Sequence, residues 1–357
     1  MSSCAVPVTD AGTKDTLSLA YMLTPPRHMT HNASPWHGPS VKPHIVKSFR
    51  SLNRAVETAI VNSAAAQCSV VGFLGPNLSR SRSRGGKVVV AGCVTCVFHY
   101  SLITVWRSKG TPWGQHSIQD LAKKARQEAE VYLEAGVDAL LVENMFDLPY
   151  VKGHQLGPEV VACMTRVCHE VRCMTPLEVP CGVQVLAGGN QAAIAVAQAS
   201  NLQFVRAEGF VFGHMGDEGL AEACAGPLLR YRRAVGAEEV LVLADIKKKH
   251  CAHAMTADVG IVETAQAAQF FLADGVIVTG TATGAEADTG ELKEVLENVD
   301  LPVLVGSGVT RDNVHAYIRA HGLIVGSHFK QGGRWTGELE PRRVRQFTEL
   351  VKRLRES

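Results

Sequence analysis

Between residues 138 and 325 the sequence repeats one pattern seven times: a short apolar run, followed by a segment with helical spacing of its apolar residues. The runs do not alternate cleanly with polar residues, which is typical of parallel strands covered on both faces. Consecutive strand–helix units without a long crossover favour a closed (β/α)8 barrel. We therefore predict an α/β fold of the TIM-barrel type, with a doubly wound sheet as the alternative.

The pattern predicts the element boundaries. The expected strands are Asp138–Glu143, Gly182–Leu186, Gln203–Arg206, Val240–Asp245, Gly275–Thr279, Val303–Val305 and Leu323–Val325. The expected helices are Ser117–Ala135, Pro158–Arg172, Asn190–Ala199, Asp217–Val235, Ile261–Leu272, Asp288–Asn298, Asp312–Ala320 and Glu340–Leu354. The first helix has the clearest signals, because Ser117 and Asp120 form a capping box and Gly136 is a stop.

An eighth strand is needed to close a barrel, and Lys87–His99 is the only apolar run upstream that could supply it. Residues 1–87 show little periodicity and many breaker residues, with one short helix expected around Ser48–Ala59. We therefore expect two parts: an irregular, basic N-terminal extension at residues 1–87 and a (β/α)8 barrel domain at residues 88–357.

Charge is distributed unevenly along the chain. Residues 1–110 hold 12 Lys and Arg but 3 Asp and Glu, whereas the remainder holds 24 and 31. A basic segment can bind nucleic acid, but these charges cluster weakly, which favours a solvated segment and no nucleic-acid partner. No hydrophobic run reaches the ~18 residues of a membrane span. The sequence leaves open whether the chain forms a homo-oligomer.

Ten cysteines are scattered through a sequence in which we find no secretory signal, so we expect reduced thiols and a cytoplasmic protein. A mitochondrial location is the alternative. Cys93 and Cys96 form a lone C-x-x-C without a second ligand pair, which is weak support for a metal or redox site. We expect Cys163, Cys168, Cys173 and Cys181 to be apolar fillers. For His154, His169 and His315 we expect surface or packing roles.

Two of the predicted strands, Val303–Val305 and Leu323–Val325, each run directly into Gly-Ser. Glycine lets the backbone approach a ligand closely, and free backbone N–H groups in such turns attract anions. In a barrel, turns after the last two strands form a phosphate pocket. The sequence therefore predicts that a small phosphorylated ligand is bound at Gly306, Ser307, Gly308, Gly326 and Ser327. Two tight turns without a ligand are the alternative.

Charged residues follow other strands at the same end of the predicted barrel. Glu143 ends one strand, and Asp245, Lys249 and His250 follow another. Carboxylates around one mouth can transfer protons or hold a divalent metal such as Mg²⁺, and a lysine beside them can bind a phosphate or an enolate oxygen. We take these four residues as catalytic candidates. The alternative is a rim of salt bridges without a catalytic role.

Several separate segments, in order, resemble the BtpA family. The matching segments are Gly136–Asn144, Asp147–Tyr150, Gly157–Thr165, Leu229–Arg233, Ala244–Asp245, Lys249–His250, Val276–Gly280, Leu301–Thr310, Val325–Ser327 and Phe329–Lys330. The resemblance covers about residues 110–350 and implies a TIM barrel of the ribulose-phosphate-binding type. Because the family's named member is implicated in photosystem I biogenesis, it also implies an alternative function, a non-catalytic assembly or stability factor for a protein complex.

The sequence departs from the family pattern at positions expected to face the barrel mouth. Val97–His99 and Gly110–Pro112 are the nearest remnants of the family's opening strand and Leu-Pro-Gly turn. Gln184–Asn190 replaces an Asn-Val-Leu-Arg-Asn-Asp-type run, Glu208 replaces an Asn, and Lys247 replaces a His. The resemblance therefore implies a retained barrel in which activity is altered or lost, and leaves open whether the protein is an enzyme.

Overall fold

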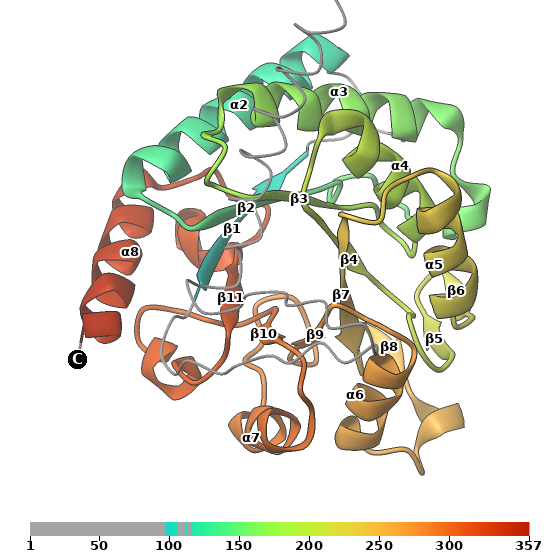
Figure 1. The fold of residues 1–357 in the computed structure, drawn as a ribbon. Coiled ribbons are helices and arrows are strands. Elements are labelled where there is room, and N and C mark those ends of the chain that lie inside the picture. The colour runs from blue at the N-terminus through green and yellow to red at the C-terminus, as the bar shows by residue number, and fades with distance from the viewer. Residues whose placement is uncertain (1–97, 106–110, 113, 115, 357) are drawn as a thin grey trace, which may run out of the picture. The chain divides into compact units, whose positions relative to one another are not determined.

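The computed structural model of the chain describes residues 98–105, 111, 112, 114 and 116–356. Within these residues eight parallel strands form a closed barrel, seen in Figure 1. In barrel order they are β1 (Phe98–Thr104), β11 (Gly322–Val325), β10 (Val303–Val305), β9 (Gly275–Val278), β7 (Leu241–Ile246), β4 (Phe204–Ala207), β3 (Cys181–Gln184) and β2 (Ala139–Glu143). The ring closes because β1 pairs with both β2 and β11. The predicted (β/α)8 barrel is confirmed.

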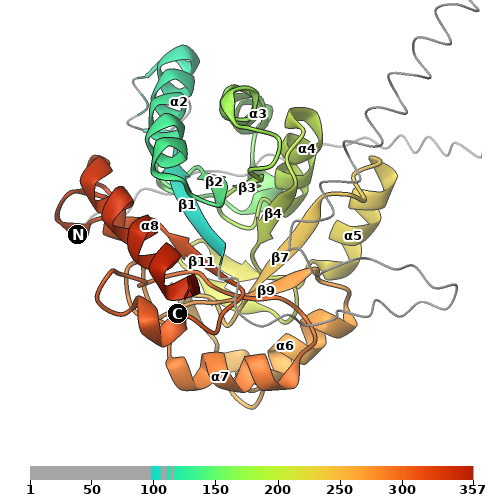
Figure 2. The same ribbon diagram turned by 60° about the vertical axis from the view of Figure 1, so that its left-hand side comes forward.

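Helices surround the strand ring in Figures 1 and 2. The α-helices are α2 (Ile118–Ala135), α3 (Pro158–Met174), α4 (Asn190–Ser200), α5 (Ala225–Ala234), α6 (Ile261–Phe270), α7 (Thr289–Asn298) and α8 (Pro341–Glu356). Short 3-10 turns are η2 (Gly153–Gln155), η3 (Ala254–Thr256), η4 (Val314–Tyr317), η5 (Ser327–Phe329) and η6 (Gln331–Gly333). The predicted capping box opens α2, since the Ser117 hydroxyl accepts from the Asp120 N–H at 3.1 Å. Gly136 ends α2 at φ +74°.

The first barrel strand extends beyond the predicted run. β1 is Phe98–Thr104, and its first two residues end the expected Lys87–His99 run, whose remainder lies outside the described residues. The apolar run therefore did not indicate that the strand that closes the ring continues to Thr104. The expected extension at 1–87, its helix at Ser48–Ala59 and the Cys93–Cys96 motif lie outside the described residues, and the division at residue 87 stays a prediction.

Two predicted helices are wrong in part. Instead of beginning at Asp217, the helix after β4 begins at Ala225, because β5 (His214–Gly216) and β6 (Gly219–Ala221) form an antiparallel hairpin first. The turn needs Gly219, whose φ is +104°. A third short strand, β8 (Cys251–Ala252), pairs with β5. Between β10 and β11, the expected helix is the single turn η4.

The core has two layers, because successive strand residues point to opposite sides of the barrel wall. One layer packs between strands and helices and contains Leu140 and Val142 of β2. The other fills the barrel interior and contains Ala139, Leu141, Phe204, Leu243, Ile277, Leu304 and Ile324. The Phe204 ring occupies the space that a Cβ at position 182 would need, so Gly182 lets this ring fill the barrel floor.

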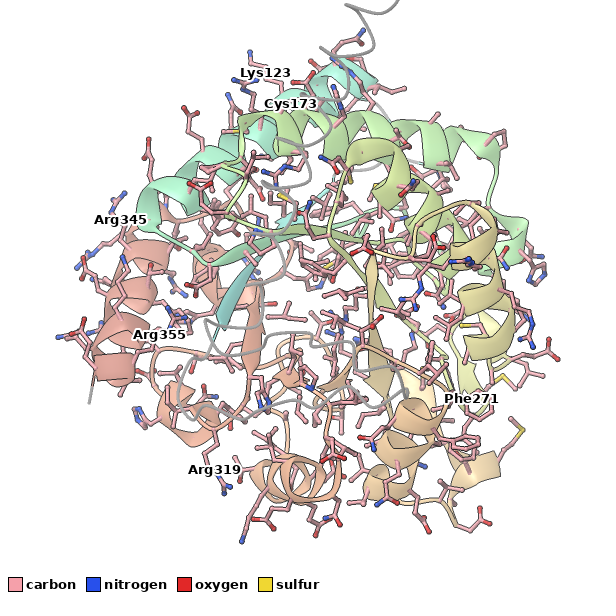
Figure 3. All side chains as sticks on the ribbon, in the orientation of Figure 1. Lys123, Cys173, Phe271, Arg319, Arg345 and Arg355 are labelled. Carbon is pink, nitrogen blue, oxygen red and sulfur yellow. The ribbon has the colours of Figure 1, made fainter. Side chains whose placement is uncertain are left out.

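Charged side chains lie on the outer surface, and Figure 3 shows labelled examples such as Lys123 and Arg345 pointing away from the barrel. The histidines expected at the surface, His154, His169 and His315, are exposed. The expected apolar fillers Cys163, Cys168 and Cys181 are buried, whereas Cys173 is exposed, so for that residue the prediction is wrong.

A buried ion pair joins the end of the barrel to its first helix. Lys330, which is 1% exposed, donates to both carboxylate oxygens of Glu128 on α2 at 2.9 Å. Beside it, the Phe329 ring packs against Tyr132 and Phe347, which belong to α2 and α8. The segment after β11 is thus fixed to two helices from opposite ends of the described chain.

Replacing Lys330 by Ala should lower the free energy of unfolding by about 3–5 kcal/mol, because it leaves the Glu128 carboxylate buried without a partner. Urea denaturation measures the change. The control is Lys124→Ala, which removes the more exposed pair with Glu338 and should cost at most ~1 kcal/mol. Equal losses in the two variants would show that burial does not set the strength of this pair.

Candidate functional site

The alternation that fills the barrel interior also selects the residues at its mouth. Moving two positions along each strand from an interior residue leads from Leu141 to Glu143, from Phe204 to Arg206 and from Leu243 to Asp245. All three side chains point into the barrel at the carboxyl ends of the strands. Their exposure is 5% for Glu143, 4% for Arg206 and 1% for Asp245, so three charged groups are buried together.

Arg206 binds both carboxylates. Its Nε and Nη2 donate to Asp245 at distances of 3.0 to 3.2 Å, which is a two-pronged contact. Its Nη1 donates to Glu143 Oε1 at 3.1 Å. Burial raises the pKa of Glu143 from its ordinary value, although the Arg206 charge opposes that rise. The Glu143 carboxyl can therefore carry a proton nearer to neutral pH than a surface glutamate does.

A second ion pair lies beside the first. The Lys248 ammonium donates to Glu208 Oε1 at 3.0 Å, and the Gly188 N–H donates to Glu208 Oε2 at 2.8 Å. Burial alone would raise the pKa of Glu208, but these donors lower it below its ordinary value. The buried Glu208 carboxylate is thus compensated by Lys248.

Lys249 differs from its two neighbours in sequence. Its backbone N–H donates to Thr279 Oγ1 at 3.0 Å, which fixes its position at the mouth. Its ammonium makes no hydrogen bond or ion pair with any described residue, whereas Lys247 donates to the Thr256 carbonyl. Burial, together with the positive charge of Arg206, lowers the pKa of Lys249 to about 8. A larger fraction of this amine is therefore unprotonated near neutral pH than of a surface lysine.

His250 is held by the loop that follows β9. The Thr283 N–H donates to His250 Nε2 at 3.0 Å, so this ring nitrogen is an acceptor and the neutral ring carries its proton on Nδ1. Burial lowers the pKa of His250, and the neighbouring Lys249 lowers it further. The side chain remains exposed at the edge of the mouth.

The two Gly-Ser turns line one cavity of about 550 Å³, which also contains Glu143, Arg206 and Lys249. The conformation of the first turn requires glycine, because Gly308 has φ +72° and a Cβ there would collide with the Ala285 carbonyl. The Ser307 hydroxyl is already engaged, since it accepts from the Gly280 N–H and donates to the Ala285 oxygen. The hydroxyl of Ser307 therefore holds the loop, and only its backbone N–H remains for an anion.

A second cavity of about 330 Å³ adjoins the first. It is lined by Asp245 and His250, and it shares Glu143, Arg206 and Lys249 with the first cavity. The structure thus brings all four catalytic candidates to one space and all five predicted anion-binding residues to the adjoining one. Their roles stay predictions, because no ligand is present.

Several residues that line the site are not among the nine predicted site residues. Met145, Thr283 and Arg206 line both cavities, and Arg311 and Arg343, the latter paired with Glu340, lie near the Gly-Ser turns. Arg206 ends a predicted strand, and strand parity indicates that it points into the barrel, since it lies two residues after Phe204. The two other arginines lie in loops and helices whose orientation the strand pattern does not specify.

A metal role is the least supported use of these carboxylates. The described residues contain no group of three His, Cys, Asp or Glu placed to hold an ion. Glu143 and Asp245 face Arg206, and Glu208 faces Lys248. The predicted divalent metal therefore stays a prediction.

Comparison with known proteins agrees with the segments that carry the resemblance. Residues 102–353 match the sequence model of the BtpA family. The chain belongs to the BtpA family. An uncharacterized mitochondrial protein of Caenorhabditis elegans is 44% identical over 265 residues, covering 72% of this chain and 93% of that protein. The photosystem I biogenesis protein BtpA of Synechocystis is 34% identical over 242 residues, covering 67% of this chain and 82% of that protein.

Among solved structures, two barrels are similar to this BtpA-family chain at low sequence identity. Orotidine 5'-monophosphate decarboxylase from Methanocaldococcus jannaschii has a TM-score of 0.45 at 14% identity, covering 72% of this chain and 99% of that one. KGPDC from Streptococcus mutans has a TM-score of 0.45 at 12% identity, covering 72% and 98%. In the described part of the chain, no helix is both long and apolar enough to cross a membrane.

Replacing Arg206 by Met should destabilise this BtpA-family barrel by about 3–5 kcal/mol at neutral pH, because Glu143 and Asp245 remain buried without a counter-charge. Loss of the arginine raises the folded-state pKa of Glu143 further above its unfolded value. The folded state then binds a proton more tightly, so the deficit is full above the raised pKa and shrinks as pH falls toward ~4.3.

Urea denaturation between pH 4 and pH 8 measures this effect. The control is Arg230→Met on the exposed face of α5, which should change stability by less than about 0.5 kcal/mol at every pH. A deficit in the Arg206 variant that grew at acidic pH would contradict the proposed charge balance.

Proposed function

We propose that this BtpA-family barrel binds a small phosphorylated ligand in the two adjoining cavities at its mouth. The carrying observation is that the turns after β10 and β11 converge on the cavity that also contains Glu143, Arg206 and Lys249. The phosphate lies at Gly306–Gly308 and Gly326–Ser327. The remainder of the ligand extends toward the ionisable groups.

Charge and backbone chemistry support this orientation. Gly308 lies beyond the end of β10 with φ +72°, and small residues in both turns leave space for close backbone contacts. Arg311 lines the same cavity and favours an anion there, whereas Asp312 also lines it and Arg343 is paired with Glu340. Of the two cavities, Asp245 and Glu208 line only the second, where they would repel a phosphate, and this difference orients the ligand.

The functional candidates at the acidic end can transfer protons but are not assigned to a reaction. Glu143 has a raised pKa and Lys249 a lowered one, so both approach the range in which general acids and bases act. Asp245 keeps both of its oxygens on Arg206 and positions that side chain. His250 stays a candidate at the exposed edge.

A Ser327→Asp variant should bind phosphorylated ligands at least about tenfold more weakly, because it places a like charge beside the phosphate; tenfold corresponds to ~1.4 kcal/mol. Isothermal titration calorimetry with inorganic phosphate and a set of sugar phosphates, with and without Mg²⁺, measures the affinity. The wild-type chain is expected to bind at least one of them.

The matched control is Ser327→Ala, which keeps the backbone N–H and adds no charge, so its affinity should stay close to that of the wild-type chain. A folded wild-type sample that binds no phosphorylated ligand would exclude the proposal. Equal binding by the Asp variant would place the phosphate elsewhere.

A non-catalytic assembly or stability factor is the second candidate function. The name of the Synechocystis relative connects that protein with photosystem I biogenesis. The end of α6 exposes three consecutive large apolar residues, with Phe270 81%, Phe271 47% and Leu272 70% exposed. Figure 3 shows Phe271 at the outer edge of the molecule. Exposed apolar patches of this kind are typical of protein-interaction surfaces.

If this patch binds a partner, a double variant with Phe270→Ser and Leu272→Ser should lose at least about tenfold in the amount of partner recovered by affinity capture. Lys249→Ala, which changes the barrel mouth, should leave the recovery unchanged. Loss of capture in the Lys249 variant instead would connect partner binding to the mouth. No loss in the double variant would exclude the α6 patch.

The compartment also stays a proposal. The cytoplasm is the predicted location and the mitochondrion the alternative, and the name of the Caenorhabditis elegans relative supports the alternative. Fractionation of cells that express the full chain would decide between them. Recovery of the protein in only the cytosolic or only the mitochondrial fraction would exclude the other compartment.

A further inference from the structure

Three consecutive lysines follow β7, and the structure separates them by their partners. Lys247 donates to the Thr256 carbonyl at 2.8 Å and lies outside the two mouth cavities. Lys248 is paired with Glu208. Lys249 lines both cavities, and its ammonium has no hydrogen bond or ion pair with any of the described residues. Only one of these three amines thus faces the proposed ligand space without being engaged elsewhere.

The position of Lys249 relative to the anion-binding turns limits what it can do. It lies where the two cavities meet, so a ligand that fills both must pass its amine. Arg206, the strongest cation nearby, is already neutralised by Glu143 and Asp245. If Lys249 served to form an ion pair, no carboxylate in the cluster would be left to pair with it. A nucleophilic role instead requires an amine that no partner engages.

We propose that Lys249 is a nucleophile that forms an imine with the carbonyl carbon of a phosphorylated aldehyde or ketone. This inference rests on the proposed function and names its ligand class. The phosphate binds at the turns after β10 and β11, and the carbonyl lies at the junction of the cavities. The lowered pKa of Lys249 supports the inference, because a desolvated lysine beside another cation is activated for attack.

The step balances with groups that line the same space. The neutral Nζ of Lys249 attacks the carbonyl carbon, the C–N bond forms, and the carbonyl electron pair moves to oxygen. Proton transfer from nitrogen to oxygen gives a neutral carbinolamine. The Glu143 carboxyl then donates its proton to the hydroxyl, which leaves as water as the C=N bond forms. The products are a protonated imine, one water and the Glu143 carboxylate, which pairs with the new cation.

A further polar group is available to the ligand. The Gln184 side chain is 2% exposed, lines the second cavity, and its Oε1 accepts no hydrogen bond within the described residues. Buried polar atoms are normally partnered. A hydroxyl group beyond the carbonyl carbon would supply the missing donor, so a hydroxylated carbonyl phosphate fits better than a purely apolar one.

Reductive trapping tests the imine. The full chain is incubated with dihydroxyacetone phosphate and sodium cyanoborohydride, and peptide mass spectrometry locates the adduct. We expect the main adduct on Lys249 and a rate that rises as pH increases through about 8. The rate rises because the unprotonated amine is the nucleophile. Unphosphorylated dihydroxyacetone, or excess inorganic phosphate, should give at least about tenfold less labelling there.

Two variants provide controls. Lys249→Arg should lose the main adduct but keep the circular-dichroism spectrum and urea midpoint of the wild-type chain, which shows that the variant is folded. Lys247→Arg should label as the wild-type chain does. The imine proposal would be overturned if the label were spread over surface lysines or were unchanged in Lys249→Arg. If calorimetry still showed phosphate binding to the wild-type chain, the proposed function would remain. Absence of phosphate binding in the wild-type chain would overturn both.

Discussion

The mouth of this barrel depends on one arginine that bridges two strands. Arg206 on β4 holds Glu143 of β2 and Asp245 of β7 inside the wall, where neither carboxylate can reach bulk water. Burying three charges is tolerated because each is paired. The cluster fixes the ends of these strands and keeps both oxygens of Asp245 on Arg206. It leaves a lysine with a lowered pKa and a glutamate with a raised pKa facing the same space. The chemical character of the site therefore follows from this charge balance.

Much of the fold could be predicted because it depends on local patterns. Apolar runs and capping residues gave strand and helix limits within one or two residues in most units, as for α2 and α4. The β5–β6 hairpin was missed, because its short strands carry no apolar run and only Gly219 indicates a turn. The opening strand was not expected to continue beyond His99, since Tyr100–Thr104 is less apolar than the segment before it.

The positions of the site residues could be predicted, but their hydrogen-bond and ion-pair partners could not. The rule that barrels work at strand carboxyl ends was enough to select Glu143, Asp245 and Lys249, and the structure places them together. Sequence could not distinguish Lys247, Lys248 and Lys249, because their partners come from loops and strands far away in the chain. It also could not show that the Ser307 hydroxyl serves its neighbouring loop, which depends on the fold of residues 280–285.

Ring closure by β1 has a consequence for synthesis on the ribosome. Phe98 pairs with Gly322, so the first and last strands of the barrel become neighbours only when nearly the whole chain has been made. Until then a growing sheet has two unpaired edges, and such edges favour association with other chains. Nascent chains of this protein therefore expose two unpaired strand edges until β11 has been made. A chain truncated before β11 keeps an open sheet.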